Sequence, residues 1–207
     1  MAHARVTTRP YSSPARHDQR NRTQLAILKA AEGVFKERGY GAATMQSVAD
    51  SARVSLPTVY LYFRSKPDLV RSLADLVTSS ADLSVERVLD ETDPNRQLEI
   101  GAGILRKLHE RSEVVADVLR TAAGGDRNLS REWQRWQQRH LAAVRAVAQS
   151  LAEGGALRSD LDVRSATDIL YTIGGRETFR QLVRERGWTA ERYERWLVEA
   201  GQRLLLS

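Results

Sequence analysis

A short run of hydroxyl and apolar side chains near residue 60 has the chemistry needed to read DNA bases. Val59 and Phe63 lie four residues apart, so on a helix they share one face and can pack inward. Leu56, Thr58 and Leu61 then point outward, where a typical surface helix carries charge. Apolar groups suit thymine methyl groups, and hydroxyls suit base edges and phosphates. The outward face therefore indicates a DNA groove as its partner.

Two short helices joined by a tight turn should position this face. The first is expected to begin at Thr44, whose hydroxyl can accept a hydrogen bond from a backbone N–H of the opening turn. Residues 51–54 are expected to form the turn. Ser55 is a second capping residue, and Pro57 lies in the first turn of the second helix, where its missing N–H costs little. These features predict a helix-turn-helix motif.

The segment resembles the recognition helix of the tetracycline-repressor (TetR) family of bacterial transcription regulators. The resemblance lies in residues 54–63 and 65–69, and with the upstream helices it covers about residues 24–70. Arg53 stands where many members carry Gly, and Leu56 and Leu61 stand where relatives often carry polar or aromatic groups. The upstream residues that match are Ile27, Leu28, Ala30, Ala31, Phe35, Gly39, Tyr40, Thr44, Val48 and Ala49. The C-terminal residues similar to the ending of many members are Gly187, Trp188, Tyr193, Trp196 and Leu197.

The resemblance implies which residues of the motif contact DNA. A hydroxyl at one helix start and a lysine at the next can each reach a phosphate, and a glutamine can pair with adenine through two hydrogen bonds. The residues implied to approach base edges are Gln46, Leu56, Pro57, Thr58 and Leu61. Those implied to hold phosphates are Thr44, Tyr60, Tyr62 and Lys66.

The positive charge of the chain is concentrated in its first third. Residues 1–69 carry 11 Lys and Arg against 5 Asp and Glu, which accounts for the whole net charge of +6. This concentration favours a phosphate-rich partner, and it favours DNA over a membrane surface. Residues 1–22 are predicted to be a basic flexible arm in which Arg20 and Arg22 contact DNA. The arm is either a disordered leader or a segment that follows a minor groove.

Composition excludes several kinds of chemistry. The 207 residues include no cysteine, which excludes disulfides, thiol nucleophiles and cysteine-based zinc sites. The four histidines show no metal-ligand spacing, and there is no Gly-rich phosphate loop or nucleophile elbow. We therefore predict no catalytic activity, no metal and no cofactor. No run is apolar and long enough for a membrane span or a signal peptide, so we expect a cytoplasmic protein.

Periodic apolar residues predict an all-α fold of about nine helices in two domains. Residues 23–68 are expected to form the helix-turn-helix DNA-binding domain, and residues 69–207 a ligand-binding and dimerisation domain. Gly39 is expected to end the first helix. The predicted helices outside the motif cover residues 23–38, 66–89, 98–109, 114–122, 130–151, 166–186 and 190–206.

An aromatic stripe on one helix of the second domain has two interpretations. Trp133, Trp136, His140 and Val144 recur every three or four residues, which is typical of a packed core. The alternative is the wall of a cavity for a small effector, because TetR-family members generally sense small molecules and pockets often lie between bundle helices. The residues predicted to line this mainly apolar pocket are Leu105, His109, Val118, Leu119, Trp133, Trp136, His140, Tyr171 and Phe179.

The last two helices carry more apolar surface than one helix pair can bury, so we predict that they form a homodimer. Gly174 and Gly175 would allow backbones to approach closely within this interface. A two-fold dimer implies a pseudo-palindromic operator. The residues predicted at the dimer interface are Ile169, Ile173, Gly174, Leu182, Trp196, Leu197, Ala200 and Leu204.

Together these features predict a ligand-responsive, sequence-specific DNA-binding regulator. Repression is the commoner direction in the family, with a small, mainly apolar effector releasing the protein from its operator. The alternative is a structural DNA-binding dimer that senses no effector. The helix that begins at Lys66 joins the two domains, so it is expected to carry the response between them.

Overall fold

The computed structural model describes residues 14–79 and 83–207, and its regular elements are helices. The prediction of an all-α fold is confirmed for this part of the chain, where extended backbone pairs only in an isolated bridge between Leu157 and Leu206. Among the described helices, none is long and apolar enough to cross a membrane. The chain divides between Leu69 and Val70 into two compact units.

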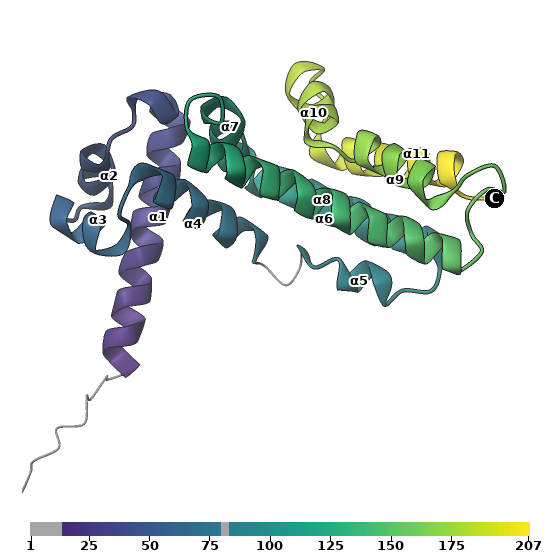
Figure 1. Ribbon diagram of the computed structural model, residues 1–207, viewed down its shortest axis with the longest axis horizontal. Coiled ribbons are helices and arrows are strands. Elements are labelled where there is room, and N and C mark those ends of the chain that lie inside the picture. Colours follow the sequence, from purple (N-terminus) through teal and green to yellow (C-terminus); the bar gives the residue numbers. More distant parts are fainter. Residues whose placement is uncertain (1–13, 80–82) are drawn as a thin grey trace, which may run out of the picture. The chain divides into compact units, whose positions relative to one another are not determined.

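The N-terminal unit contains a helix pair packed on one long helix, and it includes the first residues of a fourth helix (Figure 1). Ile27, Val48 and Val59 come from three different helices and are at most 1% exposed. With Phe63 they form the core that holds the short helices in place. The helices are α1 Pro14–Ala42, α2 Met45–Ala52, α3 Leu56–Tyr62 and α4 Lys66–Thr78.

Helix α1 begins earlier than the sequence predicted. Because it starts at Pro14, the prediction of a flexible arm is wrong for residues 14–22, and residues 1–13 lie outside the described residues. Proline suits the first turn of a helix, and a helix that is already nucleated extends at little cost. Gly39 ends the regular helix as expected, with φ 71° and ψ 166°, and a short helical turn follows to Ala42.

The C-terminal unit is a bundle in which α6 packs against α11 and α8 packs against α9 (Figure 1). One buried cluster holds Leu98, Leu151 and Leu205, and a second holds Phe179 and Tyr193. Helix α6 contributes to both clusters. The elements are α5 Glu86–Leu89, α6 Pro94–Arg111, α7 Glu113–Ala122, α8 Arg127–Glu153, α9 Val163–Ile173, α10 Arg176–Phe179, a π-helix Arg180–Glu185 and α11 Ala190–Leu205.

Two predicted long helices are interrupted in the structure. The helix predicted over 66–89 ends at Thr78, where the hydroxyls of Thr78 and Ser79 donate to carbonyls of the preceding turn and compete with helix continuation. The helix predicted over 166–186 ends at Ile173. Gly175 has an extended backbone with ψ 153° and starts α10 in a new direction. Both single-helix predictions were therefore wrong.

Candidate DNA interface and internal hollow

The helix-turn-helix motif is present as α2, a turn and α3. The Thr44 hydroxyl accepts from the Ser47 backbone N–H at 3.0 Å, and the Ser47 hydroxyl accepts from the Thr44 N–H at 3.0 Å. This reciprocal pair satisfies two N–H groups at the start of α2. The Ser55 hydroxyl accepts from the Thr58 N–H at 3.2 Å, and Pro57 lies in the first turn of α3. Both predicted helix starts are confirmed.

Arg53 makes the turn between the two helices in a left-handed conformation, with φ 56° and ψ 41°. Its backbone N–H donates to the carbonyls of Ala49 and Asp50 at the end of α2. A left-handed conformation costs a residue with a side chain roughly 1–2 kcal/mol. The turn therefore keeps the geometry that glycine adopts readily, although an arginine occupies it.

The outward face of α3 is strongly exposed where the sequence predicted DNA contacts. Leu61 is 73% exposed and Tyr60 is 49% exposed, whereas Val59, on the inward face of the same helix, is fully buried. Pro57 is exposed, and Leu56 is half-buried. The fold itself does not need these exposed side chains, which leaves them available to contact a partner.

The polar residues of the motif have local partners. The Thr58 hydroxyl lies 2.7 Å from the Ser55 hydroxyl, and the Gln46 side-chain amide donates to Asp50 Oδ1 at 2.7 Å. Thr44 is exposed, and because its oxygen accepts the capping bond, its O–H stays able to donate. Their roles at bases and phosphates stay predictions.

Lys66 and Tyr62 stand at the edges of this face. The Lys66 ammonium donates to the carbonyls of Tyr40 at 2.6 Å and Ala43 at 2.8 Å, and it lies 4.2 Å from the Tyr40 ring centre. Two of its three N–H groups are thus used inside the protein. The Arg20 guanidinium lies 5.9 Å from the ring centre of half-buried Tyr62. Arg20 and Arg22 are exposed on α1 rather than on an arm.

The C-terminal unit contains two adjoining hollows. The smaller, of about 200 Å³, is mainly apolar and lies between α6 and α8, and the larger measures about 380 Å³. Leu108, Trp136 and His140 line both, so the two hollows share a wall. Pockets with apolar walls and few polar groups are typical of small-molecule sites.

Most of the predicted pocket residues line these hollows, but three do not. Leu105 lines the smaller one, and His109, Trp133 and Tyr171 line the larger one, with Trp136 and His140 in both. Val118 and Leu119 on α7 and Phe179 on α10 are buried but line neither hollow. All three pack in the core of the chain, outside these two hollows, and a pocket role for them stays a prediction. The lining residues that the sequence interpretation missed include Gly101, Ile104, Leu108, Ala143, Val147 and Arg176.

The comparisons with known proteins agree on the kind of protein that carries this motif. The model for bacterial regulatory proteins of the TetR family matches residues 27–73. The HTH-type transcriptional regulator EthR of Mycobacterium tuberculosis is 24% identical over 165 residues, which cover 78% of this chain and 76% of EthR. Its DNA-binding domain belongs to the TetR family. It is a transcriptional regulator with a DNA-binding helix-turn-helix, and the prediction that it is not an enzyme is confirmed, because its relatives are regulators.

Solved structures show the same fold along most of this TetR-family regulator. The complex of SmeT, a Stenotrophomonas maltophilia repressor, with triclosan has a TM-score of 0.75 at 17% identity and covers 90% of this chain and 92% of its own. NalD, the secondary repressor of a multidrug efflux pump in Pseudomonas aeruginosa, has a TM-score of 0.72 at 23% identity and covers 91% of this chain and 98% of its own.

Two histidines of the TetR-family regulator are held in its C-terminal unit by different contacts. His109 is buried, and its Nε2 lies 2.9 Å from the carbonyl oxygen of Gly174, so this nitrogen carries the proton and donates. Burial lowers the pKa of His109 to about 4. His140 contacts the Tyr171 ring at 5.2 Å between centres, and burial also lowers the pKa of His140. Both rings are neutral at pH 7.

The predicted dimer residues divide into three groups by burial in this regulator. Leu197 is 5% exposed and packs in the core of its own chain, so its prediction as an interface residue was wrong. Gly174 is buried within the chain, and a Cβ there would lie 2.8 Å from Leu105 Cδ1, so its close approach is to α6 and not to a partner. Leu204 is 41% exposed. The partly buried members of the set are Ile169, Ile173, Leu182, Trp196 and Ala200.

Proposed function

We propose that this regulator is a ligand-responsive repressor that binds a pseudo-palindromic operator as a homodimer in the cytoplasm and is released by a small, mainly apolar effector. The observation that supports it best is the apolar hollow between α6 and α8. A structural DNA-binding protein has no use for such a hollow, since unfilled apolar space lowers stability. Two proteins of the same fold support the proposal: SmeT is described in complex with triclosan, and NalD as the repressor of an efflux pump.

A path for the response runs along α4 and α8. Helix α4 follows the recognition helix in the chain and continues into the C-terminal unit. There Arg71 and Asp75 line a surface hollow together with Glu132 and Arg139 of α8. The same helix α8 presents Trp136 to the effector hollows. An effector that prefers one position of α8 therefore biases α4, and by linkage it changes DNA affinity by the same factor.

The homodimer is proposed on the faces of α9 and α11. Leu204 is exposed, and Ala200 and Trp196 lie on the same helix four and eight residues before it, so they share a face. Two copies packed through these helices form a four-helix bundle, which sets two recognition helices at a fixed spacing near one turn of DNA, about 34 Å, or a multiple of it. That spacing requires two related half-sites in the operator.

The test of the regulator function is a binding series on two DNAs of equal length. One duplex comes from the region upstream of the protein's own gene, and the other is random. We expect tight binding to the first with a steep dependence on salt concentration, and binding to the random duplex weaker by about a thousandfold or more. Equal affinity for both would favour the structural DNA-binding dimer, and no binding to either would contradict a DNA-binding role.

The test of effector sensing is Gly101→Phe. Gly101 lines the smaller hollow, and a Cβ there meets no other atom within 4 Å, so a larger side chain can enter the space without a clash at its base. We expect hydrophobic compounds that quench tryptophan fluorescence in the wild type to bind this variant at least about tenfold more weakly, because the ring occupies their site. Gly101→Ala adds one methyl group and should have a smaller effect. Unchanged binding in Gly101→Phe would place the compounds elsewhere.

A further inference from the structure

Two buried nitrogens lack a hydrogen-bond partner, and both belong to residues that line the larger hollow. Within residues 14–79 and 83–207, His140 Nε2 and Arg176 Nε are the buried side-chain polar atoms without one. Buried polar groups are nearly always paired, because an unpaired one loses its hydrogen bonds to water and gains none in return. Their presence in one hollow points to a ligand that supplies the missing partners.

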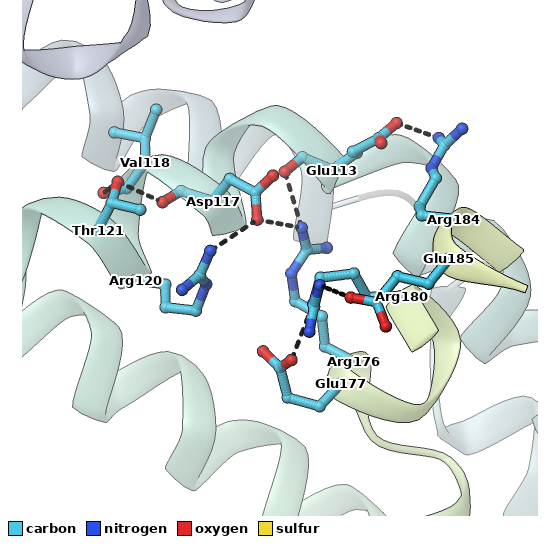
Figure 2. A network of polar contacts seen from close by, with 10 residues as sticks. All are labelled: Glu113, Asp117, Val118, Arg120, Thr121, Arg176, Glu177, Arg180, Arg184 and Glu185. Atoms are coloured by element: carbon cyan, nitrogen blue, oxygen red, sulfur yellow. Dashed lines mark hydrogen bonds and ion pairs between the residues drawn. The ribbon is translucent and has the colours of Figure 1, made fainter. Parts of the chain in front are cut away.

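Arg176 is held in place by contacts that leave its Nε–H unused. Its Nη2 donates to Asp117 Oδ1 and to the Glu113 carbonyl oxygen, each at 2.9 Å, and its side chain is 14% exposed (Figure 2). The neighbouring Arg180 differs, since its Nε donates to Glu177 Oε2 at 2.9 Å and its side chain is 36% exposed. The fold therefore fixes the guanidinium of Arg176 and leaves its Nε–H donor without a protein partner.

The charges around Arg176 are already balanced. In the network of Figure 2, Arg184 pairs with Glu113, and Arg180 pairs with Glu177 and Glu185. Asp117 lies 3.8 Å from Arg120 as well as 2.9 Å from Arg176. The four arginines thus face four carboxylates: Arg120, Arg176, Arg180 and Arg184 against Glu113, Asp117, Glu177 and Glu185. An added anion would leave a negative charge without a counter-charge in a partly buried place, so an uncharged acceptor suits the site better.

The walls of the larger hollow limit the rest of the ligand. Leu108, Trp133, Trp136 and Tyr171 give it apolar and aromatic surface, and Trp136 continues into the smaller apolar hollow. An extended apolar body can therefore follow this shared wall. His140, between the two hollows, offers a neutral ring nitrogen that can either donate or accept.

We propose that the effector is an uncharged, mainly apolar molecule with a hydroxyl group, which accepts from Arg176 Nε–H and donates to His140 Nε2. A hydroxyl is the simplest uncharged group that can do both at once. The inference rests on the proposed function, in that the hollow is taken as the effector site, and it adds the chemical class of the effector. The apolar body lies along Trp136 toward the smaller hollow.

Three probes with the same chain test the head group. 1-Octanol can accept and donate, its methyl ether can only accept, and octanoate is charged. We expect 1-octanol to bind about tenfold more tightly than either of the others, measured by calorimetry and by tryptophan fluorescence. Equal binding of all three, tighter binding of octanoate or of the ether, or binding of none would overturn the proposal.

Two variants test the named atoms. His140→Phe keeps a ring and removes Nε2, and Arg176→Lys keeps the positive charge beside Asp117 and removes Nε. Each should bring the affinity for 1-octanol down to that for the ether, whereas the matched control Arg180→Gln should keep the difference between the two probes. Helix content and melting temperature show whether each variant is folded. A folded His140→Phe that keeps the full preference for the alcohol would contradict the assignment.

The same probes separate this inference from the proposed function. If 1-octanol binds with the expected preference but leaves the protein–DNA complex intact, the head-group assignment holds and effector-controlled release fails. If a compound without a hydroxyl group releases the DNA and His140→Phe does not change its potency, release holds and the head-group assignment fails.

Discussion

Leu61→Glu is expected to lower the affinity for upstream DNA by about 100-fold at physiological salt, while the protein stays folded. Leu61 is 73% exposed on α3, so the fold does not depend on its side chain. The change removes the predicted apolar contact with a base edge, and a mismatched base pair typically costs about 1–3 kcal/mol of binding free energy. It also adds a negative charge beside DNA phosphates. Fluorescence anisotropy with a labelled duplex measures the loss.

A matched control keeps this prediction specific to the recognition helix. Leu141 on α8 is 43% exposed, so Leu141→Glu makes the same chemical change on another exposed helix of the C-terminal unit. We expect its DNA affinity to equal that of the wild type. The DNA affinity of Leu61→Ala should lie between those of the wild type and Leu61→Glu, with about a tenfold loss. If Leu61→Glu bound DNA as tightly as Leu141→Glu, α3 would not be the helix that reads the bases.

Lowering the pH from 6.5 to about 4 is expected to destabilise the C-terminal unit through His109. The pKa of this ring is about 4 in the folded protein because burial disfavours its charged form, whereas in the unfolded chain it takes up a proton near 6.5. The unfolded state therefore binds more protons across this range, and stability falls as the pH falls. The total loss is about 3 kcal/mol, from 1.36 kcal/mol per pKa unit.

Carboxylates also titrate in this range, so a variant is needed to isolate the histidine. His109→Gln keeps a side-chain donor for the Gly174 carbonyl oxygen and removes the titrating group. Urea unfolding at pH 7, 5.5 and 4.5 should show a smaller loss of unfolding free energy for this variant than for the wild type. The comparison rests on the slope with pH, so a lower stability at pH 7 does not affect it. Parallel slopes would mean that His109 becomes charged inside the folded protein.

The DNA-binding motif could be predicted from the sequence because its signals are local. Thr44 and Ser55 each cap a helix through a hydrogen bond to a residue three positions later, and Pro57 acts within its own helix turn. The prediction was wrong at residues 14–22, because a polar, arginine-rich composition is typical of a disordered segment. In the structure these residues extend a helix that has already formed. Arg20 also lies against Tyr62, a contact between residues far apart in the sequence.

The C-terminal unit was less predictable because its decisive contacts join distant residues. Gly174 packs closely against Leu105, about 70 residues earlier, and the Gly174 carbonyl oxygen accepts from His109. The sequence placed Trp136 and His140 in one pocket because they share a helix face, but Arg176 carries no periodic signal of its own. Phe179 and Leu197 were assigned to a pocket and a dimer because apolar periodicity does not specify which neighbour covers a face.

The Lys66 ammonium joins the last turn of α1 to the first turn of α4 through its bonds to Tyr40 and Ala43. Hydrogen bonds from a charged donor are about twice as strong as neutral ones, so this junction resists twisting. When α4 rotates about its axis, it must either turn the end of α1 with it or break both bonds. In the proposed response this junction is the stiff coupling that passes a rotation of α4 to α1, and a neutral side chain at position 66 is expected to let α4 turn without moving α1.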